Sequence, residues 1–175
     1  MNKYVAFLRA INVGGNSIIK MDALRRIFES FGLVNVQTYI QSGNIIFESN
    51  EDNATLQEER IESQLEKAAG YRIPLFVRTI REVKSIANQK LYKPKDNETV
   101  HVVFLNKTPV KKMKQALISL NSEADDFTVK GRHVYNLRRD RDKSVFSNNF
   151  IEKILKAPAT TRNLATIKKI AEKYK

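Results

Sequence analysis

The segment YVAFLRAINV, residues 4–13, returns in altered form as HVVFLNKTPV, residues 101–110. Both copies carry Val, Phe and Leu at matching places in an apolar run typical of a strand, and both carry a later Val. A segment with apolar residues at helical spacing follows each copy, KMDALRRIFESFG in the first half and VKKMKQALISL in the second. The repeat therefore predicts two similar folding units in tandem.

The elements around each copy follow one order. In the first half we predict strands at residues 4–9, 36–40, 45–49 and 72–78. Helices are predicted between and after them, at residues 20–31, 56–69 and 79–89. The second half repeats this order, with a hairpin about Gly131, a short strand ending at ATTRN and a final helix. Strand, helix, strand, strand, helix, strand is the order of a ferredoxin-like plait. We expect an α+β protein of two ferredoxin-like domains with antiparallel sheets, residues 1–92 and 93–175, each followed by an extra helix.

Composition limits the class of protein. The chain has 175 residues, 42% of them hydrophobic, which is enough to bury a core. It has no cysteine, and no apolar run approaches the length of a membrane span. The first residues read as a strand rather than a signal peptide, so we expect a cytoplasmic protein with no membrane partner. Two histidines leave little for a metal cage, and we expect neither metal nor cofactor.

The charge is unevenly divided along the chain. Residues 1–92 carry 12 Lys and Arg against 10 Asp and Glu, whereas residues 93–175 carry 19 against 9. Most of the net charge of +12 therefore belongs to the second half. Such an asymmetry indicates an anionic partner for that half, and a solubilising lysine surface is the alternative.

Polar and glycine residues follow the first strand and fill the first hairpin turn. In a plait the first two strands run in the same direction, so both segments are expected at one end of the sheet. Backbone N–H groups, amides and an arginine there would suit an anion. No Gly-Lys-Ser/Thr follows, so this is not a phosphate loop. Two ordinary turns are the alternative. The predicted ligand-binding residues are Arg9, Asn12, Gly14, Gly15, Gln41, Ser42 and Asn44.

A second polar group is predicted at the opposite end of the second unit. The segment NLRRDRDK leaves its third strand there, and ATTRN ends its fourth. Arginine forks around a helix N-terminus, capped by Thr160 or Thr161, would suit phosphate or carboxylate. In the alternative, Asp140 and Asp142 neutralise the arginines. The predicted anion-binding residues are Arg138, Arg139, Arg141, Thr160, Thr161, Arg162 and Asn163.

The sequence supports no catalytic residue set. Glu58, Glu59 and Glu62 are expected on a solvent-facing helix stripe, and His101 on a strand is expected to be packed. No nucleophile, base and orienting group can be placed together, so catalytic residues stay unknown.

Three motifs carry a family resemblance: LRAINVGGN, TYIQSGNIIFES and ATTRN, at residues 8–16, 38–49 and 159–163. In this order they are similar to the LRGINVGG, YIQSGNVVF-like and TTRNW motifs of an uncharacterised bacterial family, domain of unknown function 1697. The resemblance implies two tandem α-β plaits and brings no agreed activity, substrate or cofactor. Ala10 replaces the usual glycine, which indicates an ordinary backbone there. Leu164 replaces the usual tryptophan, which removes an aromatic ring and an N–H donor.

Three functions remain open at this point. A small anionic ligand, such as a nucleotide or acidic metabolite, would bind the polar loops of the first half. Alternatively, the basic second half would bind nucleic acid without sequence preference. In the third alternative, a leftover apolar sheet face would pair with a protein partner or form a homodimer. We expect the small ligand rather than nucleic acid.

Overall fold

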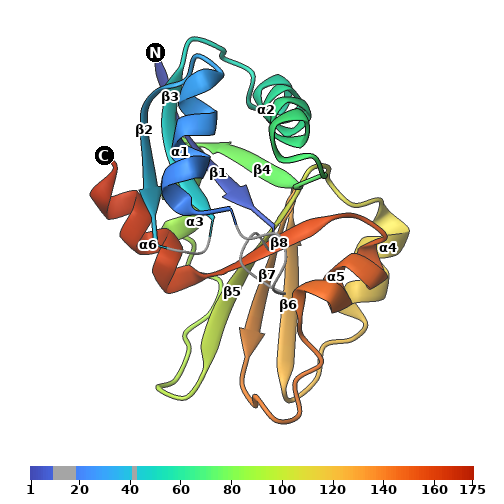
Figure 1. The fold of residues 1–175 in the computed structure, drawn as a ribbon. Helices are drawn as coiled ribbons and strands as arrows, with labels where there is room; N and C mark the ends of the chain where they lie inside the picture. Colours follow the sequence, from blue (N-terminus) through green and yellow to red (C-terminus); the bar gives the residue numbers. More distant parts are fainter. Residues whose placement is uncertain (10–18, 41–42) are drawn as a thin grey trace. The chain divides into compact units, whose positions relative to one another are not determined.

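The computed structural model describes residues 1–9, 19–40 and 43–175 (Figure 1). The elements of the first half are β1 (Asn2–Leu8), α1 (Met21–Ser30), β2 (Val34–Tyr39), β3 (Asn44–Ser49), α2 (Ala54–Ala69), β4 (Leu75–Thr79) and α3 (Ile80–Ala87). Those of the second half are β5 (Thr99–Leu105), α4 (Lys111–Ile118), β6 (Asp125–Lys130), β7 (His133–Arg138), α5 (Asn148–Leu155), β8 (Ala159–Asn163) and α6 (Leu164–Lys173).

The first sheet has the strand order β2-β3-β1-β4, and its neighbouring strands are antiparallel. Alternate residues of β1, Tyr4 among them, share one buried cluster with residues of α1 and α2. Figure 1 shows these two helices beside the first sheet. The Phe47 ring of β3 stacks on Tyr4 with centroids 5.6 Å apart and meets Phe28 of α1 edge-on at 5.9 Å. Burying such side chains contributes about 1.5–3 kcal/mol each, so the two helices are held by their apolar faces.

The second sheet repeats this plan with the order β6-β7-β5-β8, again antiparallel. Val103 and Leu105 of β5 pack with Leu117 of α4 and Ile151 of α5. The predicted tandem of two similar α-β units is therefore confirmed at the level of two four-stranded antiparallel sheets. Pro74 precedes β4, an edge strand, where its missing N–H leaves no sheet partner unsatisfied.

The compact units differ from the predicted halves at their borders. One unit comprises residues 1–85 together with 170–175, and the other comprises residues 86–169. Within the first unit, the Tyr174 ring meets Tyr39 of β2 edge-on with centroids 6.2 Å apart. The Lys173 ammonium lies 5.3 Å from both ring centroids. These contacts attach the last residues of the chain to the first unit.

Helix starts fall into two kinds. Asn53 caps α2, because its Oδ1 accepts from the backbone N–H groups of Thr55 and Leu56 at 2.9 and 3.2 Å, and Ser147 caps α5. In contrast, α1 and α4 begin after Lys20 and Val110 without a side-chain cap. None of the helices in the described part of the chain has the length and apolar character needed to cross a bilayer.

Candidate functional site

Three chain segments meet at one end of the first sheet. The backbone N–H of Leu8 donates to the Gly43 carbonyl at 2.8 Å, and the N–H of Arg9 donates to the Pro74 carbonyl at 2.9 Å. Gly43 has φ 74°, a left-handed conformation that favours glycine. The end of β1 therefore lies beside the β2–β3 turn, as the strand directions predicted. We call Arg9, Lys20, Gly43 and Asn44 the strand-end rim.

The rim contains only part of the predicted ligand-binding set. Asn12, Gly14, Gly15, Gln41 and Ser42 lie outside the described residues. Asn44 is fully buried, and its amide donates to the Tyr39 carbonyl at 3.0 Å, which stabilises the hairpin end. Arg9 is half-buried, and Lys20 is exposed directly before α1. The described rim thus offers two cations beside a helix start that has no side-chain cap.

The second unit has an equivalent end with a much shorter loop. There the Leu105 N–H donates to the Arg132 carbonyl at 3.0 Å, which matches the Leu8–Gly43 bond. Twelve residues separate Leu8 from Met21, whereas five separate Leu105 from Lys111. The strand-to-helix connection of this plan can therefore be made with five residues, and the first unit uses seven more.

The predicted arginine group of the second unit is divided by the sheet. On β5, Thr99 pairs with Arg138 and His101 pairs with Asn163, so the last residues of β7 and β8 lie at the same end of the sheet. Arg162 pairs with Val102, three positions from Thr99, so Arg138 and Arg162 project from opposite faces. The four arginines therefore do not form one cluster.

Arg162 is buried rather than presented to solvent. It is 8% exposed and donates to Thr160 Oγ1 at 2.8 Å and to the Thr161 carbonyl at 2.9 Å. Burial lowers the pKa of the Arg162 guanidinium to about 10. A hydrated anion would have to enter the interior to reach this group.

The expectation that Thr160 or Thr161 caps α6 is wrong. Thr160 and Thr161 lie within β8, and the helix is capped instead by Asn163, whose Oδ1 accepts from the Ala165 N–H at 2.9 Å. Thr161 donates to Asn148 Oδ1 at 2.9 Å, and the Asn148 amide donates to the Ala159 carbonyl at 2.9 Å. A residue of α5 thereby covers the edge strand β8.

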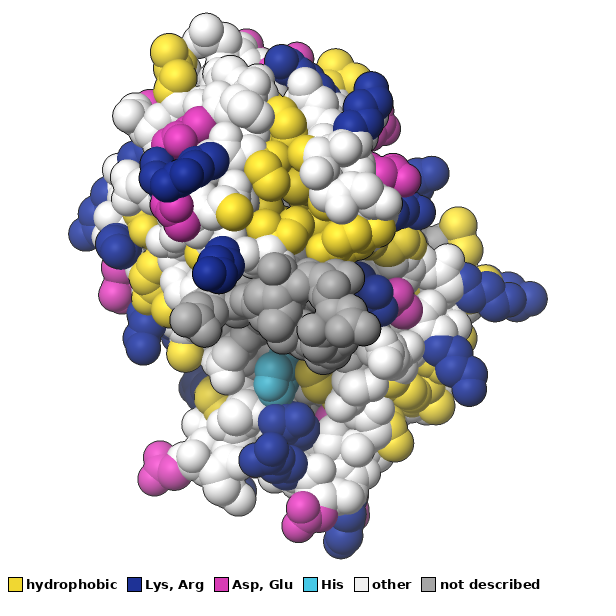
Figure 2. Space-filling model, viewed as in Figure 1, with side chains coloured by type: hydrophobic (Ala, Val, Ile, Leu, Met, Phe, Trp, Pro, Cys, Tyr) yellow, Lys and Arg dark blue, Asp and Glu magenta, His cyan; other side chains and the backbone are white. Residues whose placement is uncertain are grey.

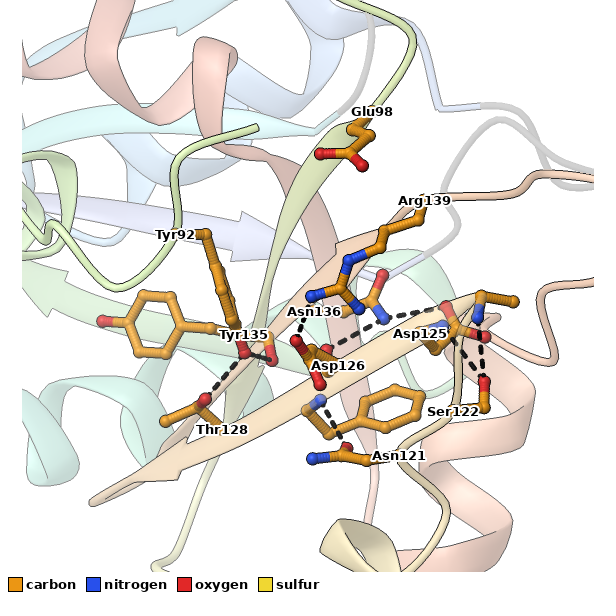
Figure 3. A network of polar contacts seen from close by, with 12 residues as sticks. Tyr92, Glu98, Asn121, Ser122, Asp125, Asp126, Thr128, Tyr135, Asn136 and Arg139 are labelled. Atoms are coloured by element: carbon orange, nitrogen blue, oxygen red, sulfur yellow. Dashed lines mark hydrogen bonds and ion pairs between the residues drawn. The ribbon is translucent and has the colours of Figure 1, made fainter. Parts of the chain in front are cut away.

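Arg139 and the loop that follows it belong to a polar network on β6 and β7 (Figure 3). Arg139 forms an ion pair with Asp126, which neutralises it. The fully buried Asp125 accepts from Asn136 Nδ2 at 3.0 Å, from Ser144 Oγ at 2.8 Å and from the Val145 N–H at 2.9 Å. The loop after β7 is therefore fastened to β6, and of its arginines Arg141 is exposed.

The same network reaches His101. Its Nδ1–H donates to Asn136 Oδ1 at 3.3 Å, and its ring lies 4.9 Å from the Phe146 ring centroid. Burial, and secondarily the Arg138 guanidinium, lowers the pKa of His101, although Asn136 and Asp125 oppose this shift. His101 is thus a packed residue in a polar setting, as its strand position predicted.

The lowered pKa of His101 makes the free energy of unfolding depend on pH. Between the folded pKa of His101 and the ordinary value of about 6.5, the unfolded chain binds more protons than the folded one. We expect stability to rise with pH through this window and to level off above it. His101→Gln should remove that part of the rise in urea denaturation at a series of pH values. Equal slopes for the wild type and the variant would contradict the assignment.

One buried ion pair was not predicted. Glu58, expected on a solvent-facing stripe, is 3% exposed, and its Oε2 lies 3.6 Å from Nη1 of the fully buried Arg78. The expectation for Glu58 is therefore wrong. Glu62 is half-buried and pairs with Arg72 at 2.7 Å, whereas Glu59 is exposed. Among the described residues, no group of three or more His, Cys, Asp or Glu side chains could hold a metal ion.

The described geometry defines a tandem two-sheet α+β protein with a polar rim at one strand end. The chain belongs to the family described as "Protein of unknown function (DUF1697)", whose model matches residues 1–135. The resemblance read from the motifs is therefore confirmed. The solved structure of the conserved bacterial protein SP0830 from Streptococcus pneumoniae is similar over 99% of both chains, with 23% identity and a TM-score of 0.78. No curated protein matches the chain.

Proposed function

We propose that the protein binds a small anionic ligand, a nucleotide or an acidic metabolite, at the strand-end rim of its first unit. The observation that carries the proposal is that twelve residues connect β1 to α1, whereas five connect the equivalent strand and helix of the second unit. Connecting segments carry a disproportionate share of binding residues, because a rigid scaffold positions them at the surface.

The charges at the rim favour an anion. Arg9 and Lys20 are its described cations, and the acidic residue of the first turn of α1, Asp22, is engaged by Arg25 and Arg26 at 3.0 Å. The α1 N-terminus has no side-chain cap, so its dipole favours negative charge. In this proposal Asn12, Gly14, Gly15, Gln41 and Ser42 supply further donors from the two neighbouring segments.

The same proposal includes the finer assignment of fold and location. We infer that each unit is a ferredoxin-like plait and that the two arose by duplication, which the shared strand order and the paired Leu8 and Leu105 bonds support. We place the protein in the cytoplasm, because a chain without cysteine uses no disulfide.

Thermal shift measurements test the ligand. Adenosine diphosphate, inorganic phosphate and citrate would be added separately to the intact protein. A ligand at a hundredfold excess over its Kd should raise the Tm by roughly 5 °C or more. Arg9→Ala should weaken the binding about 10- to 100-fold, because it removes a charge-assisted hydrogen bond.

Arg81→Ala is the matched control. β4 runs antiparallel to β1, so the exposed Arg81 that follows it lies at the opposite end of the same sheet. This variant should keep the full thermal shift. Loss of the shift in both variants alike, or no shift with any of the three probes, would contradict the proposal.

A further inference from the structure

Six lysines gather around the start of α4 and the end of α5. Lys107 and Lys156 both line a pocket of about 280 Å³, together with Val110, Met113 and Leu155, so the two helix ends are neighbours. Dark-blue side chains project from this part of the surface in Figure 2. We call the group the lysine surface; its exposed members are Lys107, Lys111, Lys112, Lys114, Lys153 and Lys156.

Carboxylates are scarce around these charges, and Glu152 of α5 is the one that neighbours them in sequence. Residues 106–122 contain neither Asp nor Glu, and the acidic residue of α5, Glu152, accepts from the Asn148 amide at 2.7 Å. Within the described part of the chain, none of the six lysines forms an ion pair. The unit of residues 86–169 carries 18 Lys and Arg against 8 Asp and Glu. The lysine surface therefore presents a concentrated positive potential.

The lysines of α4 stand where a helix disfavours cations. Lys111, Lys112 and Lys114 occupy its first turn, beside the positive end of the helix dipole. That turn has no acidic residue, and Val110 supplies no side-chain cap. Helix stability therefore does not explain the cluster, and residues that break a local rule in this way are expected at functional surfaces.

We propose that the lysine surface binds the phosphate backbone of a double-stranded nucleic acid without reading its sequence. The two segments that carry these lysines, residues 106–122 and 148–157, contain no arginine, the residue suited to bidentate contacts with guanine. The exposed large apolar residue at this end of α4 is Val110, and no exposed aromatic ring is available here among the described residues. Single strands are bound by stacking on such rings, so their absence favours a duplex.

The dimensions agree with a small backbone footprint. Eight residues make α4 about 12 Å long, which spans three to four base pairs of a duplex. An anionic membrane is less well matched, because surface-binding helices insert several apolar or aromatic side chains between the lipids. The proposal concerns the second unit and does not depend on the small-ligand site of the first.

Fluorescence anisotropy with two labelled 20-base-pair duplexes of unrelated sequence tests the proposal. The wild type should bind both equally, and log Kd should change with log salt with a slope of about 3 to 5 in magnitude. Replacing Lys111, Lys112 and Lys114 together by Gln should weaken binding at least tenfold and reduce the slope by about 2 to 3. Because the change relieves repulsion at the helix start, the Tm of this variant should not fall.

The matched control replaces Lys90, Lys93 and Lys95 by Gln. These lysines are exposed in the same unit, and the control changes the net charge by the same amount. It should keep most of the affinity. Equal loss in the two triple variants would mean that only net charge acts, and would overturn the proposal. Absence of duplex binding at about 50 mM salt would also overturn it, whether or not phosphatidylserine-containing vesicles bind the protein.

Discussion

Glu58→Ala is expected to lower the free energy of unfolding by about 3–5 kcal/mol, because it removes the carboxylate that faces the buried Arg78 guanidinium. The Glu58 carboxylate also accepts from the backbone N–H of Val77 at 2.7 Å. β4 is an edge strand, so that N–H would otherwise have no partner on the open side of the sheet. One side chain of α2 therefore both neutralises a buried cation and covers a sheet edge.

Urea denaturation followed by circular dichroism measures this effect, and three further variants isolate its cause. Glu59→Ala, one residue along the helix and exposed, should stay within about 0.5 kcal/mol of the wild type. Glu58→Gln keeps an acceptor for the Val77 N–H and should lose less free energy of unfolding than Glu58→Ala. The double variant Glu58→Met and Arg78→Met should be more stable than Glu58→Ala, because it leaves neither of these two charges in the interior. A Glu58→Ala variant as stable as Glu59→Ala would refute the assigned role.

Asp125→Ala is expected to cost about 3 kcal/mol of folding free energy, because it removes the buried carboxylate that accepts from Asn136, Ser144 and Val145. The loss should concentrate in the loop after β7, which Asp125 fastens to β6. That loop contains Arg139, Arg141 and Lys143, so its release would expose new sites to trypsin.

Limited trypsin digestion under native conditions reports on this loop directly. The initial cleavage rate in residues 138–143 should rise at least tenfold in Asp125→Ala, since each 1.4 kcal/mol of lost protection is about a factor of ten. Asp142→Ala is the control, because Asp142 is exposed in the same loop and should leave the rate unchanged. An unchanged rate in Asp125→Ala would show that the loop is held by other contacts.

Much of the fold could be predicted because its signals are local. Apolar periodicity located the strands and helices of both halves, and the similarity of residues 4–8 to 101–105 predicted two sheet units of the same plan. The directions of β1 and β2 then predicted that Arg9 would lie beside the first hairpin turn, which the Leu8–Gly43 bond bears out. Each of these inferences needs only the side-chain period and the connectivity of one unit.

Predictions that depended on the direction of a side chain were wrong or only partly right. Glu58 lies among charged neighbours on α2, and its burial follows from the position of Arg78 across the packed layers, which helix periodicity does not contain. Thr160 and Thr161 resemble helix caps in sequence, yet pairing with β5 continues to Asn163, and this last strand residue caps the helix. The four arginines lie toward one end of the sheet, but side chains alternate between the two faces along β7 and β8. This alternation puts Arg138 and Arg162 on opposite faces.

The sequence alone determined the tandem plan, the order of the strands along the chain and the end of each sheet at which the loops lie, because these depend on periodicity and chain direction. Only the tertiary structure decided which charges are buried, which are paired and which remain exposed. The reason is physical: the environment of a charge is set by residues distant in the sequence, as Arg78 is for Glu58 and Asp126 for Arg139.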